Sequence, residues 1–275
     1  MVVQHNLTAA NTNRQLGITT NGLQKSTEKL SSGYKINRAA DDAAGLSISE
    51  KMRNQIRGLN KASDNAQDGI SLVQTAEGAL NEVHSMLQRM SELAVQAANG
   101  TNATTDRTAL NDEVQQLKTE IQRVGSTTQF NKMNILDGGF SAGTKKALQV
   151  GANANQTISI AISALKSVVG SSLSDALKIS TATNAQSAIT TVQSSIEKLS
   201  TLRSKLGAVQ NRLEHTVANL DNISENTQSA ESRIRDTDMA EEMVQYSKNN
   251  ILQQAGQSML AQANQANQGV LSLLQ

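Results

Sequence analysis

Hydrophobic residues recur at helical spacing along most of the chain and predict five helices. In the first, over about 7–30, Leu16, Leu23 and Leu30 follow one another every seventh residue. A seven-residue repeat is typical of a coiled-coil seam. The positions between these leucines are mostly Thr, Asn and Ser, so we expect this helix to be marginal by itself.

The segment 31–56 carries several residues that interrupt helices. Gly33 follows a pair of serines, and Gly45 follows Asp41 and Asp42. A carboxylate satisfies free N–H groups at a helix start, so we expect one of the two aspartates to cap the next helix. We interpret the whole segment as a mixed connector.

Two helices are predicted next, over about 57–99 and 105–125, each with an apolar stripe on one face. At 1.5 Å per residue the first spans about 65 Å, more than a compact domain needs. We expect it to end at Asn99–Gly100, with Gly100 in the left-handed conformation that glycine favours after a helix. The short connection predicts that the two helices are antiparallel neighbours.

The middle of the chain, 126–164, differs in character and is rich in glycine. Two short runs, 146–150 and 157–162, are separated by turn-forming residues and predict a β-hairpin. The following segment, 165–185, is rich in Ser, Thr and Ala without a clear period, and we interpret it as a short, variable surface connector.

The last two predicted helices cover about 185–235 and 240 to the end. The former has the most sustained apolar stripe in the chain, and the latter has a weaker seven-residue repeat. The residues assigned to this repeat are Leu252, Gly256, Met259, Ala263, Ala266, Val270 and Leu273. No charged side chain occurs between Asn249 and Gln275, so we expect this helix to be covered by other protein surfaces.

Composition supports a mainly α fold: a long antiparallel helical bundle or coiled coil with a small β-hairpin in the middle. The 275 residues include no Pro, Cys or Trp and only two Tyr and two Phe. Absence of Pro permits long helices, and so few aromatic residues predict a thin core. The net charge of +1 does not favour nucleic-acid binding.

Neither a metal site, a catalytic site nor a membrane span is expected. The three histidines are scattered without metal-ligand spacing, and no cofactor is predicted. No run approaches the ~18 apolar residues of a membrane helix, and the N-terminal sequence lacks the pattern of a cleaved Sec-type signal. Methionines at helical positions are interpreted as core filling, and Asn-X-Ser/Thr sequences as weak glycosylation signals.

The two ends of the chain are expected to be disordered or fraying in the monomer. Ordering costs roughly 1–2 kcal/mol of backbone entropy per residue. The terminal stripes consist mostly of Ala, Thr, Gly and a few Leu, and that apolar area does not offset the cost within one chain. We therefore predict that the ends become helical when they pair and other subunits surround them.

Six strings closely resemble bacterial flagellin. They are LSSGYKINRAADDAAGLSIS (30–49), LQRMSELAVQAANGT (87–101), TQFNKMNIL (128–136), LQVGANANQTI (148–158), SRIRDTDMAEEM (232–243) and ILQQAGQSMLAQANQ (251–265). The resemblance covers almost the whole chain in order. It implies a structural subunit, not an enzyme, that self-assembles into the extracellular flagellar filament and serves swimming motility. The ending NQANQGVLSLLQ departs from the family in lacking Pro and a terminal Arg.

The resemblance also implies two layers in the filament. Residues 1–45 and 236–275 correspond to a terminal coiled-coil domain in the inner tube, and 46–235 to an outer-tube bundle with its hairpin at about 128–164. With 165–185 as the only connector, the chain resembles a short flagellin without large outer domains. Leu16, Leu23 and Leu30, together with the repeat of the last helix, are the expected polymerisation seam.

Partners are implied by the same resemblance. They are further copies of the chain, an export chaperone on the tail 236–275, the flagellar type III export apparatus, and the filament cap and hook-junction proteins. The flagellin-sensing Toll-like receptor of animals is another. Its expected patch is Gln88, Arg89, Glu92, Leu93, Glu113 and Gln116, although Leu93 is equally interpreted as packing between protofilaments. Nucleic-acid binding and membrane insertion are not expected.

Two other functions stay open at this point. A hook–filament junction protein shares such terminal helices, and a secreted helical adhesin or effector would carry a similar amphipathic pattern.

Overall fold

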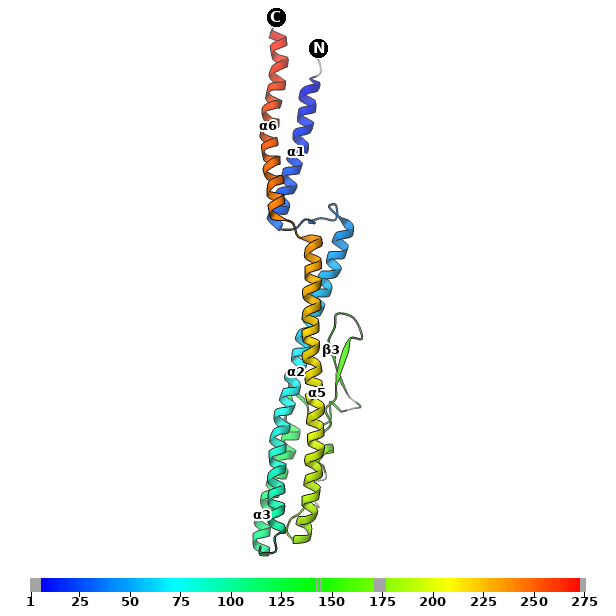
Figure 1. Cartoon of the computed structure of the whole chain (residues 1–275), viewed down its shortest axis with the longest axis vertical. Helices are drawn as coiled ribbons and strands as arrows, with labels where there is room; N and C mark the ends of the chain where they lie inside the picture. The colour runs from blue at the N-terminus through cyan, green and yellow to red at the C-terminus, as the bar shows by residue number, and fades with distance from the viewer. Residues whose placement is uncertain (1–5, 142, 144, 171–176, 273–275) are drawn as a thin grey trace. The chain divides into compact units, whose positions relative to one another are not determined.

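The computed structural model describes residues 6–141, 143, 145–170 and 177–272, and the description of the fold refers to these. The helices are α1 (Leu7–Ser32), α2 (Ala43–Ala98), α3 (Thr104–Thr127), α4 (Leu165–Val169), α5 (Ala182–Arg235) and α6 (Met239–Ser272). The strands are β1 (Gln129–Phe130), β2 (Met133–Asn134), β3 (Lys146–Gln149) and β4 (Thr157–Ile160). This composition confirms the mainly α fold (Figure 1).

The chain separates into two compact units. Unit 1 contains 1–55 and 225–275, and unit 2 contains 56–224. The segments 46–55 and 225–235 therefore belong with the terminal helices in this structure, whereas the sequence analysis places them in an outer layer. The layers refer to an assembled filament, so that division stays a prediction.

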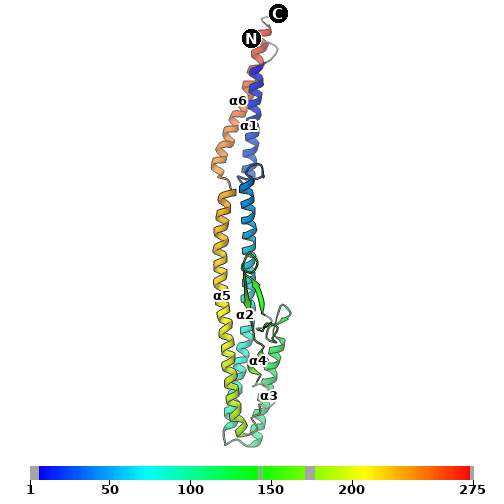
Figure 2. The same cartoon turned by 90° about the vertical axis from the view of Figure 1, so that its right-hand side faces the viewer.

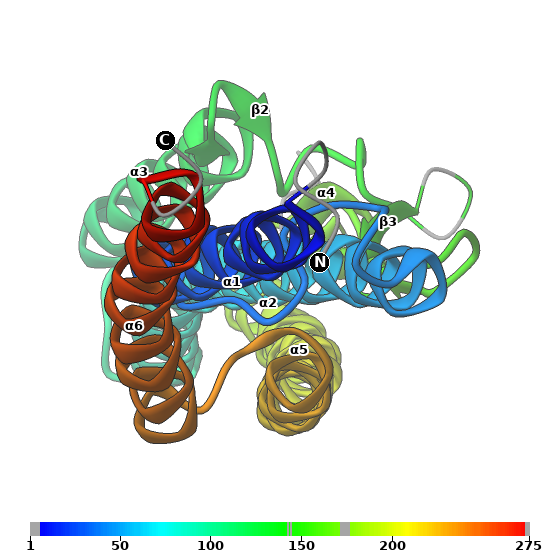
Figure 3. The ribbon, with the colours of Figure 1, turned by 90° about the horizontal axis from the view of Figure 1, so that it is seen from above.

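In unit 1, α1 and α6 lie side by side and antiparallel (Figures 1 and 3). The Asn6 side chain donates to the Ala263 carbonyl at 3.0 Å, and Lys29 at the other end of α1 pairs with Glu242 at 3.3 Å. Gly33 ends α1 with φ +76° and donates to the Lys29 carbonyl. Glycine suits this left-handed position because it has no Cβ.

The expected mixed connector over 31–56 is wrong in its second half, because α2 begins at Ala43. Asp42 caps this helix by accepting from Gly45 N–H at 2.9 Å, as one alternative predicted. Gly45 is buried within the first turn next to Ile36, so it marks close packing and not the end of a helix.

Unit 2 is built around a large hydrophobic core between α2, α3 and α5, and a smaller cluster of Leu59, Ala62 and Leu220 lies between α2 and α5. The largest fully buried side chains of the large core include Leu87 and Leu93 from α2, Ile121 from α3 and Leu199 from α5. Helix α3 returns alongside the end of α2 (Figure 2), as the short connection predicts.

The end of α2 is stabilised by an arginine. The Arg107 guanidinium of α3 donates to the Ala97 carbonyl at 3.0 Å and to the Asn99 carbonyl at 3.1 Å. Gly100 does not have a positive φ, so the left-handed conformation expected there is wrong. The carbonyls at this helix end obtain their donors from a side chain instead.

The predicted hairpin is present as the antiparallel pair β3–β4, with Lys146 opposite Ile160 and Gln149 opposite Thr157. It lies against α2, where the Asn65 side chain donates to the Gln149 carbonyl at 3.0 Å. A second, shorter hairpin, β1–β2, was not predicted.

The interpretation of 165–185 as a surface connector is wrong in part. Leu165, Val169, Leu177 and Ile179 are all buried in the core of unit 2. Ile179 N–H donates to the Asn111 side chain of α3 at 3.1 Å. Residues 171–176 of this connector lie outside the described residues.

Candidate functional site

The interface between α1 and α6 is lined by small and polar residues. The buried residues of α1 are Thr19 and Ser26, seven positions apart. Where the helices approach, a Cβ added at Gly22 would lie 3.2 Å from Asn249 Nδ2, and one at Gly256 would lie 3.3 Å from Leu16 Cδ1. Glycine at these two positions permits the close approach.

The register of α6 differs from the predicted one. Apart from Asn250, its half-buried residues within 242–263 recur in a regular 4–3 pattern as Glu242, Tyr246, Asn249, Gln253, Gly256, Leu260 and Ala263. Leu252 and Met259 are 47% and 57% exposed. They therefore do not face α1, whereas Gly256 and Ala263 do, and the assignment of Leu252 and Met259 to a polymerisation seam stays a prediction.

The other members of the expected seam differ in what the structure describes for them. Leu16, Leu23 and Leu30 are half-buried in α1. Ala266 and Val270 lie in α6, and Leu273 lies outside the described residues. Polymerisation through any of these residues stays a prediction.

Large apolar side chains surround α6 outside its interface with α1. The exposed ones are Met239, Met243, Val244, Ile251, Leu252 and Met259. At about 100° per residue, Met243 lies on one flank of the interface, Val244 opposite it and Leu252 on the other flank. Exposed apolar side chains are thus distributed over several sides of α6 outside its interface with α1.

Unit 1 also contains a junction held by one arginine. At the end of α5, the Arg235 guanidinium lies 4.7 Å from the Tyr34 ring centroid and donates to Glu50 of α2 at 2.7 Å. The Arg235 carbonyl accepts from Lys35 N–H at 2.6 Å. The hydrogen bond from Arg235 is the main cause of a lowered pKa of Glu50. One side chain thus joins three segments of unit 1.

A charged surface patch in unit 2 joins α2 to α3. Arg89 Nε donates to Glu113 at 2.9 Å, and Arg89 Nη1 donates to Glu92 at 3.1 Å. These two carboxylates, Glu113 first, raise the pKa of Arg89 further above its ordinary value. Gln88 and Gln116 are also exposed.

The remaining member of the expected receptor patch is not on the surface. Leu93 is 0% exposed and belongs to the core of unit 2. It therefore offers no contact area to a receptor or to a neighbouring subunit in this structure. A shallow groove of about 810 Å³ is lined by Gln88 and Glu92 of the patch together with Val95 of α2 and Ile196 of α5.

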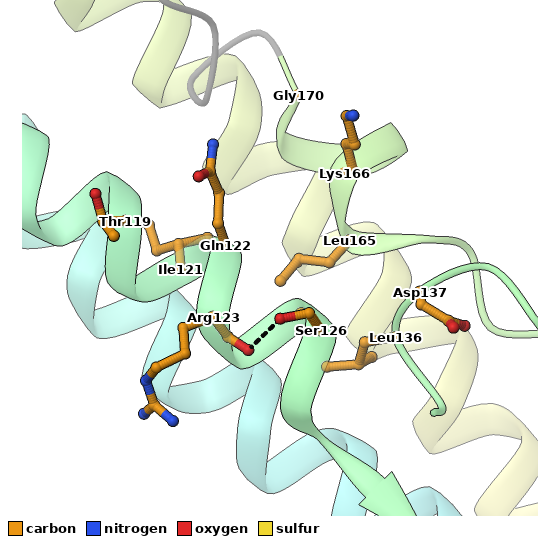
Figure 4. Close-up of a pocket in the computed structure, with 11 residues that line it drawn as sticks. Thr119, Ile121, Gln122, Arg123, Ser126, Leu136, Asp137, Leu165, Lys166 and Gly170 are labelled. Carbon is orange, nitrogen blue, oxygen red and sulfur yellow. Dashed lines mark hydrogen bonds between the residues drawn. The ribbon is translucent and has the colours of Figure 1, made fainter. Parts of the chain in front are cut away.

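A second hollow, also of about 810 Å³, lies between α3 and α4 (Figure 4). Its surface includes the apolar side chains of Ile121, Leu136 and Leu165. The Ser126 hydroxyl donates to the Arg123 carbonyl at 3.0 Å, and the Arg123 guanidinium pairs with Glu120. These polar groups are engaged locally, and their arrangement does not resemble a catalytic constellation.

The described residues offer neither a metal site nor a helix that could span a membrane. They contain no group of three or more His, Cys, Asp or Glu side chains placed to hold a metal ion. No helix among them is long and apolar enough to cross a membrane.

Comparison with known proteins identifies the family. Residues 3–141 match the bacterial flagellin N-terminal helical region, and residues 189–274 match the C-terminal helical region. A flagellin of Halalkalibacterium halodurans is 58% identical over 275 residues, with both chains covered completely. The chain belongs to the bacterial flagellin family.

Further relatives of this flagellin agree in function and fold. The flagellar filament 31.3 kDa core protein of Treponema maltophilum is 48% identical over 288 residues and is covered completely, as is this chain. The crystal structure of Bacillus cereus flagellin matches with a TM-score of 0.51 and 32% identity, covering 57% of this chain and 88% of that one. As a flagellin, the protein is a structural subunit of the flagellar filament.

Sequence reasoning missed two features of this flagellin. The 4–3 pattern in α6 consists mostly of polar residues, so a search for apolar repeats overlooked it. Arg235 gave no sequence signal because its partners, Tyr34 and Glu50, are far away along the chain. Thr19 and Ser26 did carry a signal, a seven-residue spacing parallel to that of the leucines.

Proposed function

We propose that this flagellin polymerises with further copies through the apolar surface around α6, together with exposed parts of α1. The observation that carries the proposal is the distribution of Met243, Val244 and Leu252 over both flanks and the back of α6. A dimer would cover one side, whereas a tube of subunits covers several. The absence of charge after Lys248 keeps such contacts free of desolvation penalties for ions.

The test places one charge on each of two sides of α6. Val244→Glu and Leu252→Glu are each expected to abolish filaments seen by electron microscopy, while circular dichroism of the monomer stays unchanged. Met133→Glu is the matched control, because Met133 is 42% exposed in unit 2. Normal filaments from both α6 variants would contradict the proposal.

The order of the terminal segments is the second part of the proposal. The α1–α6 interface buries few large apolar side chains, which supports the prediction that the ends gain full order only among other subunits in an inner tube of 1–45 and 236–275. Backbone NMR of the monomer tests this prediction. Sharp, protected helical signals from 6–35 and 245–272 would exclude it.

The export route of the chain and its location outside the cell are proposed from the same family relationship. We propose that the chain leaves the cell through the flagellar type III apparatus and is extracellular in the filament. An export chaperone covers the tail 236–275 beforehand, and the cap and hook-junction proteins are partners during growth. The exposed apolar side chains of α6 support the need for such a chaperone. A pull-down of the chaperone with and without residues 236–275 tests its site.

Receptor recognition is proposed for the five exposed residues of the patch, centred on Arg89. Arginine is favoured at binding hot spots because it combines charge with planar contact area. Arg89→Ala is expected to weaken binding to the receptor ectodomain in titrations of the monomer. Arg123→Ala is the control, since Arg123 is an exposed arginine on α3 that pairs with Glu120 outside the patch. Equal affinities would exclude Arg89 as an anchor.

A further inference from the structure

The dipeptide Asn-Gly occurs twice in the chain, as Asn21–Gly22 and Asn99–Gly100. In such a pair the glycine backbone nitrogen can attack the asparagine side-chain carbonyl carbon, because no Cβ shields it and its dihedral angles are permissive. Both sequences are therefore chemically competent, and their local structure decides which of them reacts.

The surroundings of Asn99 permit this attack. Asn99 and Gly100 are exposed and follow Ala98, the last residue of α2. Among the described residues Gly100 N–H has no hydrogen-bond acceptor, and a Cβ added at Gly100 would meet nothing within 4 Å. Thr101 N–H donates to Asn99 Oδ1 at 3.4 Å, which polarises the carbonyl to be attacked.

The surroundings of Asn21 oppose the same reaction. Asn21 and Gly22 lie inside α1, where backbone N–H groups bond to carbonyls four residues earlier and the dihedral angles are fixed. Gly22 also lies against Asn249 of α6. Ring closure at this site therefore requires local opening of the helix.

We propose that Asn99 is a site of spontaneous deamidation and that folding protects Asn21. A bond forms between Gly100 N and Asn99 Cγ, the Cγ–Nδ2 bond breaks, and the amide proton leaves with the nitrogen as ammonia. Water then opens the cyclic imide at either carbonyl and gives aspartate or isoaspartate. The overall reaction consumes one water and releases one ammonia, without an oxidant or a cofactor.

The product changes the end of α2. A new carboxylate lowers the formal net charge of the chain from +1 by one unit. It appears at a helix C-terminus, where negative charge is unfavourable, and next to Arg107, which donates to the Ala97 and Asn99 carbonyls. An ion pair with the new carboxylate competes with these two hydrogen bonds, so deamidation loosens the connection between α2 and α3.

The test follows both sites in the full-length protein assembled into filaments, in which we propose that α1 is fully ordered, during prolonged incubation at mildly alkaline pH. Peptide mass spectrometry is expected to show deamidation at Asn99 at least about tenfold faster than at Asn21, since a helix-opening free energy of about 1.4 kcal/mol gives tenfold protection. In urea the two rates are expected to converge. Enzymatic methylation of isoaspartate confirms the product.

Gly100→Ala provides the matched variant. The added methyl group meets open space, so the fold is retained, while attack by the backbone nitrogen is hindered. Deamidation at Asn99 is expected to slow by about tenfold or more, equivalent to about 1.4 kcal/mol in the barrier. Equal rates at Asn99 and Asn21 in the folded protein, or an unchanged rate in Gly100→Ala, would overturn the proposal.

Discussion

Substitution of Leu93 tests whether this side chain supports the core or forms part of a surface patch. Leu93 is 0% exposed and belongs to the core cluster of unit 2. Leu93→Ala removes buried methyl groups and leaves a cavity, which costs about 2–5 kcal/mol. For a unit of this length, 56–224, each kcal/mol shifts the Tm by roughly 2–4 °C. We therefore expect a decrease of about 4–20 °C.

The measurement is thermal unfolding of the monomer followed by circular dichroism. Val95→Ala is the control because Val95 lies two residues along α2 and is 56% exposed; its effect should stay within about 0.5 kcal/mol. If Leu93→Ala unfolded at the same temperature as Val95→Ala, the burial argument would be refuted. Loss of receptor binding in Leu93→Ala must accordingly be compared with its loss of stability.

Substitutions at three further sites, two of them with a matched control, have expected outcomes that follow from local contacts. Asp42→Ala removes the acceptor for Gly45 N–H and should lower the free energy of unfolding by about 0.5–2 kcal/mol in denaturant titrations. Asp42→Asn keeps an acceptor oxygen and should retain most of the parent's stability. Gly58→Ala places a Cβ 2.9 Å from Ala152 Cβ and should destabilise by about 1–3 kcal/mol, while Gly78→Ala, in open space, should stabilise by about 0.5–1 kcal/mol; equal effects would contradict the contact. Because the pKa of Glu50 is lowered in the folded protein, its ion pair with Arg235 stabilises unit 1 at pH values above the unfolded-state pKa of about 4.3. This stabilisation is lost as the pH falls through the lower pKa that Glu50 has in the folded protein. Glu50→Gln should therefore unfold with a weaker acid dependence than the parent, and identical pH profiles would argue against this ion pair.

The helices could be predicted from sequence because most of them bury one apolar stripe within the chain. The predicted ranges for α1, α3 and α5 agree with the structure within a few residues. The start of α2 could not be predicted from sequence, because Gly45 looks like a helix breaker. In the structure Gly45 packs against Ile36 within the first turn of the helix.

Local turn chemistry and long-range contacts explain the other differences. The β1–β2 hairpin turns through Asn131 and Lys132, both with positive φ, and such turns usually carry Asn-Gly or Asp-Gly. Its strands are also only two residues long, which is too short for an alternating pattern. Leu177 and Ile179 looked like connector residues because the helices that cover them are distant in sequence.

The candidate surfaces were predictable to a different extent. The charged patch around Arg89 was found through resemblance, and its five polar members are exposed, but sequence could not tell that Leu93 faces inward. In α6 the apolar repeat did not identify the face that contacts α1, because the large apolar residues Leu252 and Met259 face away from α1. Strong hydrophobicity indicates burial without indicating which chain provides the cover.

The small residues between α1 and α6 have a mechanical consequence. Because Asn6 contacts Ala263, the start of α1 lies beside the end of α6, and a load applied to the two chain ends separates these helices one turn after another. At Thr19 and Ser26 each step breaks contacts of small side chains without extracting a large one. An optical trap should record this separation as a gradual extension at low force, before the abrupt rupture of unit 2.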